Sequence, residues 1–122
     1  TLEQSVRLVL NALELMRGGE VFVPIIPSMS VLELAKAVAP GAQVQFTGIR
    51  PGEKLHETLI TEEEARRTVK YPNLPVDVIH PDSPTWEYAG VESGIVPPDF
   101  IYTSRTYGNQ YTDDEIRELI PV

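Results

Sequence analysis

The sequence contains no cysteine among its 122 residues, which excludes a disulfide framework and any chemistry that needs a thiolate. Long hydrophobic runs are also missing, because no apolar stretch approaches the roughly 18 residues that a membrane span requires. Basic residues are few, with 10 Lys and Arg against 18 Asp and Glu and a net charge of −8. Nucleic acids and anionic membranes are bound through basic surfaces. We therefore expect neither as a partner, and we expect a cytoplasmic protein in which an anionic ligand needs a local basic site.

Several catalytic and cofactor motifs are absent as well. The glycines form neither the G-x-G-x-x-G array of dinucleotide-binding turns nor a phosphate-binding P-loop. No Tyr-x-x-x-Lys pair and no G-x-S-x-G nucleophile elbow is present. The two histidines, His56 and His80, lie far apart, and no metal-ligand spacing surrounds either of them. The residues thus predict no catalytic group, no cofactor site and no metal site within this chain.

Length and turn-forming residues bound the architecture. A chain of 122 residues makes one ordinary domain, and 11 prolines with eight glycines predict short elements joined by many turns. The chain begins at Thr1, which is predicted to form a capping box with Gln4 at the start of a helix. We interpret this abrupt start as that of an excised or processed piece.

The first part of the chain predicts helices that alternate with short strands. The opening helix, stopped by Gly18 and Gly19, carries one apolar stripe at helical spacing, made of Leu2, Val6, Val9, Leu13 and Met16. Next come a strand over Glu20–Ile26, a helix over Val31–Ala39 capped by Ser30 and Glu33, and a strand over Gln43–Thr47. This order of strand, helix and strand favours a parallel pair with a crossover helix.

The second part is more irregular. Leu55–Ile60 fits either a strand or an irregular arm, and Thr61 with Glu64 caps a short helix over Glu62–Thr68. Val76–Ile79 is interpreted as the last strand. Residues 81 to 108 are rich in Pro, Gly, Ser, Asp and aromatics, which indicates an ordered tail on a surface or a partner arm. Thr112 and Glu115 cap a final helix over Asp113–Ile120.

One connection, Gly48–Glu57, concentrates two glycines, a proline and five ionisable side chains. Pro51 biases Arg50 toward an extended backbone, and Gly52 permits a positive φ, so the loop has a rigid start and a tight corner. Such a corner holds Arg50 and Glu53 at a fixed separation. If the preceding strand is parallel to its neighbour, the loop leaves from the carboxyl end of a strand, where open α/β sheets bind ligands.

The residue types in this loop suggest a nucleotide diphosphate. The guanidinium of Arg50 offers a planar fork of donors for phosphate oxygens, and the carboxylate of Glu53 can accept hydrogen bonds from neighbouring ribose hydroxyls. The alternative is an Arg50–Glu53 surface ion pair above a proline-glycine turn, with no ligand at all. Spacing alone leaves both interpretations open.

The same ten residues, Gly48–Glu57, resemble the signature near the C-terminus of bacterial UDP-N-acetylglucosamine 4,6-dehydratases of the inverting kind. These enzymes are extended short-chain dehydrogenases. Further similarity lies in residues 1–4, 18–24, 26–29 and 102–104 and in Asn109. Retaining, membrane-anchored relatives usually carry tyrosine where this chain has His56, so this position favours the inverting, soluble branch.

The resemblance implies an enzyme of two lobes. An N-terminal Rossmann lobe holds NADP and the catalytic residues, and this chain resembles the smaller C-terminal lobe that closes over the UDP-sugar. It implies a mixed α/β (α+β) fold with a few short strands, three or four helices, an irregular tail and no Rossmann domain. Arg50 matches an arginine that contacts the diphosphate and Glu53 an acidic residue that contacts the ribose. The same signature includes Pro51, Gly52, Lys54 and His56.

We expect a dehydratase lobe that belongs to a homo-oligomeric enzyme. Two other interpretations stay open. The chain could be the lobe of another nucleotide-sugar epimerase or dehydratase, or a non-catalytic interaction module. We expect a substrate-binding lobe over residues 1–82, with residues 83–122 packed on it or on a partner subunit. The tail aromatics are more often core than interface in a small domain; they are Trp86, Tyr88, Phe100, Tyr102 and Tyr107.

Overall fold

The computed structural model describes residues 1–83, 94–106 and 110–119, and it combines short strands with helices. In chain order the elements are α1 (Leu2–Leu15), β1 (Val21–Pro24), α2 (Val31–Val38), β2 (Thr58–Ile60), α3 (Glu62–Ala65), β3 (Thr68–Lys70), β4 (Val76–Ile79), β5 (Gly94–Ile95), β6 (Tyr102–Thr103) and α4 (Asp113–Leu119). This content confirms the predicted mixed α/β class.

Two small antiparallel sheets organise the chain. The larger sheet has the order β1-β4-β3-β5, with Val23 opposite Asp77 and Val69 opposite Val78. Because β1 lies at the edge of this sheet, Pro24 costs no ladder hydrogen bond on its outer side. The second sheet joins β2 to β6. Strands that are far apart in sequence therefore lie side by side.

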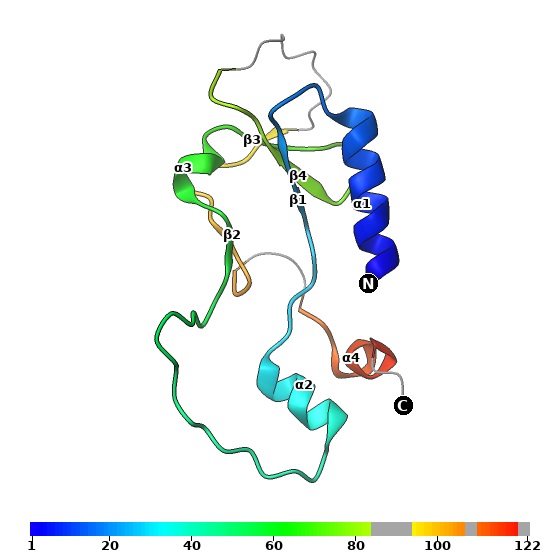
Figure 1. Cartoon of the computed structure of the whole chain (residues 1–122), viewed down its shortest axis with the longest axis vertical. Coiled ribbons are helices and arrows are strands. Elements are labelled where there is room, and N and C mark those ends of the chain that lie inside the picture. The colour runs from blue at the N-terminus through cyan, green and yellow to red at the C-terminus, as the bar shows by residue number, and fades with distance from the viewer. Residues whose placement is uncertain (84–93, 107–109, 120–122) are drawn as a thin grey trace.

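Each face of the larger sheet buries its own cluster of side chains. On one face Val69, Val76 and Val78 pack with Leu8 of α1 and Phe22 of β1. α1 runs alongside this sheet in Figure 1. The alternate residues of β1 and β4 point to the other face, where the cluster consists of Val23, Ile60, Ile79 and Tyr102, with Phe100 packed against it. The small β2–β6 sheet thereby becomes part of the core.

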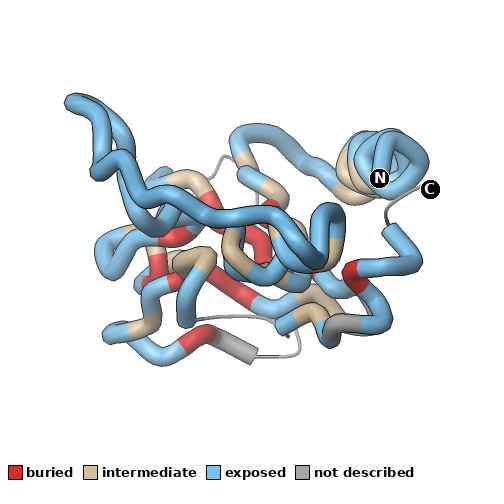
Figure 2. The backbone as a smooth tube through the Cα atoms, turned by 90° about the horizontal axis from the view of Figure 1, so that it is seen from below, coloured by how far each residue is buried: buried red, intermediate tan, exposed pale blue. Residues whose placement is uncertain are grey.

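A long exposed arm leaves this core. Every residue from 38 to 59, between the end of α2 and the end of β2, is exposed. Figure 1 shows that this segment extends away from the sheets. Figure 2 shows most of the buried positions gathered in one part of the molecule, with long stretches of exposed backbone outside it. The predicted candidate residues all lie on this arm.

Helix caps account for where the helices begin. The capping boxes predicted from Thr1, Ser30 and Thr61 are all confirmed. At α4 the amide of Thr112 donates to Glu115 Oε2 at 2.8 Å, and the Glu115 amide donates to Thr112 Oγ1 at 3.3 Å. These reciprocal bonds satisfy donors that the first turn leaves without partners.

The structure corrects two strand predictions. Gln43–Thr47 forms no strand: its residues are exposed coil, and Phe46 is 83% exposed. Alternation specifies a strand only where a neighbouring strand supplies its hydrogen bonds. The parallel pair is also wrong, because β1 pairs antiparallel with the distant β4. The Gly48–Glu57 loop consequently does not leave from the carboxyl end of a parallel strand.

Other helices and strands differ from the prediction in their bounds or their number. The helix predicted over Glu62–Thr68 ends at Ala65 because Thr68 already belongs to β3. Val76–Ile79 is confirmed as a strand, but β5 and β6 follow it. Those two strands contain two residues each, which is too short for an alternating pattern to reveal them.

Candidate functional site

A tight turn at residues 50–53 is the geometric centre of the candidate site. The Glu53 amide donates to the Arg50 carbonyl oxygen at 3.0 Å, which closes a four-residue turn. Gly52 has φ +87°, and Pro51 stands before it, which is the residue order of a type II turn. The Arg50 amide in turn donates to Glu53 Oε2 at 2.9 Å. Backbone and side chain together fix this corner, as the Pro51 and Gly52 pattern predicts.

The two charged groups of the turn lie near each other but remain open to solvent. Arg50 Nε is 4.0 Å from Glu53 Oε1, and their side chains are 84% and 51% exposed. An ion pair of this length and exposure contributes little to stability. The guanidinium is thus available to an anion, and Glu53 Oε1 is the carboxylate oxygen on the same side as the guanidinium nitrogen.

Hydrogen bonds tie the base of the arm to the tail. The Glu57 amide donates to Ser104 Oγ at 3.1 Å, and the Ser104 amide donates to the Glu57 carbonyl oxygen at 2.8 Å. The adjoining β2–β6 pairing continues this connection. Sequence reasoning did not single out Ser104 as an anchor, although residues 102–104 are among those that carry the resemblance.

Tyr102 joins the same region to the end of β1. Its hydroxyl group accepts the Ile26 amide hydrogen at 3.1 Å and lies 3.3 Å from the Pro24 carbonyl oxygen. Further along, Gln110 Nε2 donates to Ser28 Oγ at 2.7 Å, and the Tyr111 amide donates to the Ser28 carbonyl oxygen at 3.0 Å. Hydrogen bonds from Tyr102, Gln110 and Tyr111 therefore join the described part of the tail to residues 24–28.

The remaining signature residues and the tail aromatics fall into three groups. Lys54 and His56 are exposed on the arm, and Arg50 and Glu53 are the pair that the turn brings together. Tyr102 is buried, and Phe100 packs on its cluster. Trp86, Tyr88 and Tyr107 lie outside the described residues.

Within the part of the chain that the structure describes, no group of three or more His, Asp or Glu side chains is placed to hold a metal ion.

Three carboxylates elsewhere have lowered pKa values. Partial burial raises the pKa of Glu20, but the amides of Arg17 and Gly18, which donate to its carboxylate at 2.8 and 2.7 Å, lower it overall. The backbone and hydroxyl of Thr61 lower the pKa of Glu64 by donating to its carboxylate. Thr112 does the same for Glu115. These groups stabilise a turn and two helix starts, and none of them lies on the candidate loop.

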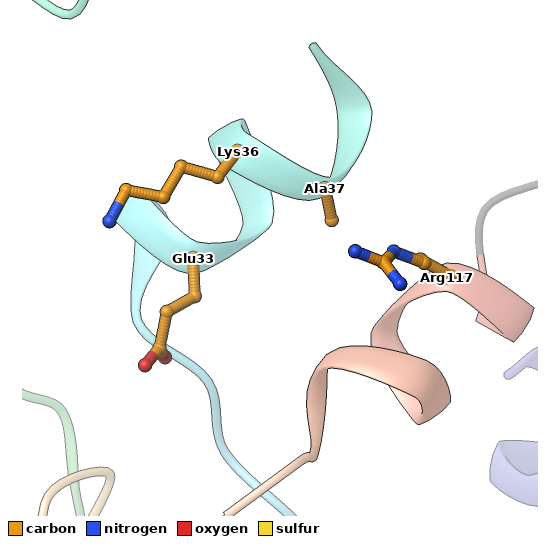
Figure 3. Close-up of a pocket in the computed structure, with 4 residues that line it drawn as sticks. All are labelled: Glu33, Lys36, Ala37 and Arg117. Carbon is orange, nitrogen blue, oxygen red and sulfur yellow. The ribbon is translucent and has the colours of Figure 1, made fainter. Parts of the chain in front are cut away.

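Two hollows in the described surface lie away from the loop. One, of about 220 Å³, is lined by Glu33, Lys36, Ala37 and Arg117 of α2 and α4. Figure 3 shows Lys36 pointing away from Arg117, so the two cations do not converge on one ligand position. The other hollow, of about 400 Å³, lies between the polar side of α1, the end of β1 and Tyr111.

Comparison with known proteins supports the fold and then the family. Pen from Bacillus thuringiensis, known from an X-ray structure, superimposes with a TM-score of 0.77 and 25% identity over 98% of this chain and 36% of its own. The polysaccharide biosynthesis protein family matches residues 1–77. The chain belongs to this family, and the match includes the whole Gly48–Glu57 loop.

The chain is also similar to several individual proteins. The inverting UDP-N-acetylglucosamine 4,6-dehydratase from two Campylobacter jejuni strains is 45% identical over 73 residues, which are 60% of this chain and 22% of the relative. An uncharacterized membrane protein of Methanocaldococcus jannaschii is 39% identical over 75 residues, which are 52% of this chain and 22% of its own. A UDP-glucose 4-epimerase of Rickettsia canadensis is 34% identical over 84 residues, which are 63% of this chain and 25% of the relative. The match thus spans about a fifth to a quarter of each relative. The resemblance to the inverting dehydratases is confirmed at the level of the family.

Among the described residues, no helix has the length and apolar character needed to cross a membrane.

Proposed function

We propose that this chain is the UDP-sugar-binding lobe of an NADP-dependent UDP-N-acetylglucosamine 4,6-dehydratase of the inverting type. The observation that carries the proposal is the Arg50–Glu53 turn, which presents a guanidinium beside a carboxylate within the residues that the family matches. We place the enzyme in the cytoplasm, where it supplies sugars for bacterial surface or flagellar glycans. The proposal assigns this chain a binding role and no catalytic residue.

The turn suits the two polar parts of a nucleotide diphosphate. The exposed guanidinium of Arg50 can donate two parallel hydrogen bonds to phosphate oxygens. Glu53 keeps Oε2 on the Arg50 amide, which leaves Oε1 to accept a hydrogen bond from a ribose hydroxyl group. Because the chain carries a net charge of −8, this local cation is what makes an anionic ligand acceptable. Pro51 and Gly52 shape the corner, while Lys54 and His56 lie exposed beside it.

In the proposed enzyme the reaction takes place on the hexose. NADP, which would be held by the rest of the protein, would supply the reversible hydride transfer that oxidises C4 and reduces C6. The C4 ketone acidifies the C5 proton, so that water is lost across C5 and C6. The lobe described here holds the remote UDP group, and the binding energy of that group orients the reacting sugar.

The decisive experiment measures UDP binding by the full-length protein. We expect Arg50→Ala to weaken binding by about 1.5–3 kcal/mol, the usual value of a hydrogen bond to a charged group. Lys36→Ala removes an exposed cation from α2 and serves as the matched control, for which we expect unchanged affinity. Equal affinity of the Arg50→Ala variant and the parent protein would exclude this role for Arg50.

A second candidate is the lobe of a UDP-sugar 4-epimerase, which the similarity to the Rickettsia enzyme favours. The two candidates differ in product: a dehydratase releases a 4-keto-6-deoxy sugar, and an epimerase only inverts C4. Proton NMR of a reaction mixture distinguishes them, because only dehydration converts the C6 hydroxymethyl group into a methyl group. A third possibility, an assembly role for the tail, is tested by measuring the mass of the full-length protein in solution; a monomeric mass would exclude that role.

A further inference from the structure

The arm between α2 and β2 has few connections to the rest of the described chain. Residues 43–57 are all exposed. Among the described residues, their hydrogen bonds and ion pairs either stay within the Arg50–Glu53 turn or involve Glu57. Both hydrogen bonds of Glu57 go to Ser104 of the tail. Because a segment without buried side chains gains little order from packing, these two bonds are the main support of the turn.

The bonds between Glu57 and Ser104 are reciprocal, and we call them the Glu57–Ser104 clamp. The Glu57 amide donates to Ser104 Oγ at 3.1 Å, and the Ser104 amide donates to the Glu57 carbonyl oxygen at 2.8 Å. Glu57 follows Glu53 by four positions, a distance of at most about 14 Å along the chain. On the other side, Arg50 follows the last residue of α2, Val38, by 12 positions, or up to about 43 Å. The clamp is therefore the nearer of the two attachments of the turn.

Ser104 is itself held in place from both sides. Tyr102, two residues before it, is 1% exposed and belongs to a core cluster. After Ser104 the chain turns at once, because the Thr106 amide donates to the carbonyl oxygen and to Oγ1 of Thr103, both at 3.2 Å. A buried aromatic ring on one side and a closed turn on the other fix the backbone of Ser104. Its amide and hydroxyl group therefore form a rigid anchor for the arm.

We propose that Ser104 is a positioning residue for UDP-sugar binding, which acts by holding Glu57 and thereby placing the Arg50 guanidinium. The inference rests on the proposed function, in which Arg50 binds the diphosphate. Water can replace a hydrogen bond to an exposed amide, so the hydroxyl group of Ser104 adds little to the stability of the fold. A looser arm, however, must be ordered when the ligand binds, and that ordering lowers affinity. Because Ser104 lies beyond residues 1–77, which the family matches, the inference gives the tail a part in ligand binding.

UDP titration of full-length variants tests the role of the hydroxyl group. Ser104→Ala removes the acceptor of the Glu57 amide hydrogen and keeps the amide of residue 104. We expect its affinity for UDP to fall about three- to tenfold, and we expect Ser104→Thr, which keeps a hydroxyl group, to restore most of that loss. Thr106→Ala is the matched control, because its hydroxyl group bonds within the tail to Thr103 and Ile101; its affinity should not change. Equal affinities of Ser104→Ala and a parent protein that binds UDP would overturn the inference.

A double variant distinguishes positioning from a general effect on the fold. If Ser104 acts by placing the Arg50 guanidinium, its substitution loses most of its effect once that guanidinium is gone. We expect Arg50→Ala with Ser104→Ala to bind UDP within about twofold of Arg50→Ala alone. Losses that multiply in full would show that Ser104 acts independently of Arg50 and would contradict the inference.

Trypsin cleavage reports on the arm in the absence of any ligand. Lys54 is exposed between the turn and Glu57. We expect trypsin to cut the full-length Ser104→Ala variant after Lys54 roughly threefold faster or more than the parent, because the weakened clamp opens more often. Peptide masses measure this rate, and Thr106→Ala should cleave as the parent does. An unchanged rate in Ser104→Ala would overturn the inference.

The two measurements together separate this inference from the proposed function. UDP affinity that falls in Arg50→Ala but not in Ser104→Ala would refute the positioning role and leave the binding role of the turn intact. Faster cleavage of Ser104→Ala, with UDP affinity unchanged by Arg50→Ala, would refute the binding role and leave Ser104 as the anchor of the arm.

Discussion

Glu53 holds the Arg50 amide through one carboxylate oxygen, Oε2 at 2.9 Å, while its other oxygen, Oε1, lies 4.0 Å from the Arg50 guanidinium. One carboxylate therefore shapes the turn and also balances the charge of the cation that the turn presents. A loop built this way keeps its geometry before any ligand arrives. Its preorganisation reduces the ordering cost that binding would otherwise incur.

Substitution of Glu53 can separate these two tasks. Glutamine keeps an oxygen that can accept the Arg50 amide hydrogen but loses the charge, so we expect Glu53→Gln to weaken UDP binding of the full-length protein by about 1 kcal/mol. Glu53→Ala also loses the turn contact and should weaken binding by about twice as much. Calorimetric titration measures both, with Glu33→Gln on α2 as the control. Identical affinities for the parent and both Glu53 variants would contradict a binding role for this carboxylate.

Gly52 supplies a backbone conformation that other residues adopt with strain. Its φ is +87°, and a Cβ added there would meet nothing within 4 Å. Gly52→Ala should therefore cost about 1–3 kcal/mol through backbone strain alone. We expect the arm to shift and UDP affinity to fall, while the melting temperature of the core changes little. At Gly41 φ is not positive and an added Cβ would also meet open space, so Gly41→Ala should leave the affinity unchanged.

The Tyr102 hydroxyl group links β6 to the end of β1. Tyr102→Phe leaves the Ile26 amide hydrogen, now bonded at 3.1 Å, without this acceptor in a partly buried position. We expect a loss of about 1–3 kcal/mol in the free energy of unfolding, measured by urea denaturation. Tyr71→Phe, in the other core cluster, is the control and should cost less. A Tyr102→Phe variant as stable as the parent would show that water replaces the bond.

Acid should destabilise the folded chain by protonating Glu64 and Glu20, whose carboxylates accept backbone amide hydrogens. The pKa values of Glu64 and Glu20 are lowered in the folded chain from the ordinary 4.5. Both groups therefore add stability above pH 4.5, and that stability is lost as the pH falls through their folded values. We expect a flat melting temperature above about pH 5.5 and a decline below pH 4.5. Glu64→Gln should flatten part of that decline, and an unchanged acid profile would argue against its contribution.

The sequence predicts capping boxes and turns, which depend on residues close together in the chain. It does not predict strand pairing, which depends on residues far apart in the chain. Thr61 and Glu64 stand three apart, so their capping box is legible from sequence. The Arg50–Glu53 turn is equally local, because Pro51 and Gly52 determine it. The partner of β1 is β4, and nothing near Val23 in the chain indicates that Asp77 lies opposite. Gln43–Thr47 shows the converse, since its alternating pattern lacks a neighbouring strand among the described residues.

The anchoring of the arm is likewise a long-range property. Ser104 meets Glu57 only because β6 pairs with β2 across the core. Two-residue strands leave no periodic signal, so sequence reasoning could not place Ser104 at the base of the arm. Nor does the sequence show that the apolar stripe of α1 is exposed, as at Leu13, which is 63% exposed, because helical spacing indicates an apolar side but not what faces it.

The antiparallel ladder between β1 and β4 has a consequence for how members of this family can diversify. The arm lies within the segment between Pro24 and Val76, whose two ends the ladder holds opposite each other. The entropy of closing a loop grows slowly with length, by only about 0.6 kcal/mol for each doubling. Insertions or deletions in the arm therefore cost the sheet little. The length and charge of the arm that carries the Arg50–Glu53 turn can therefore change while the β1–β4 ladder stays intact.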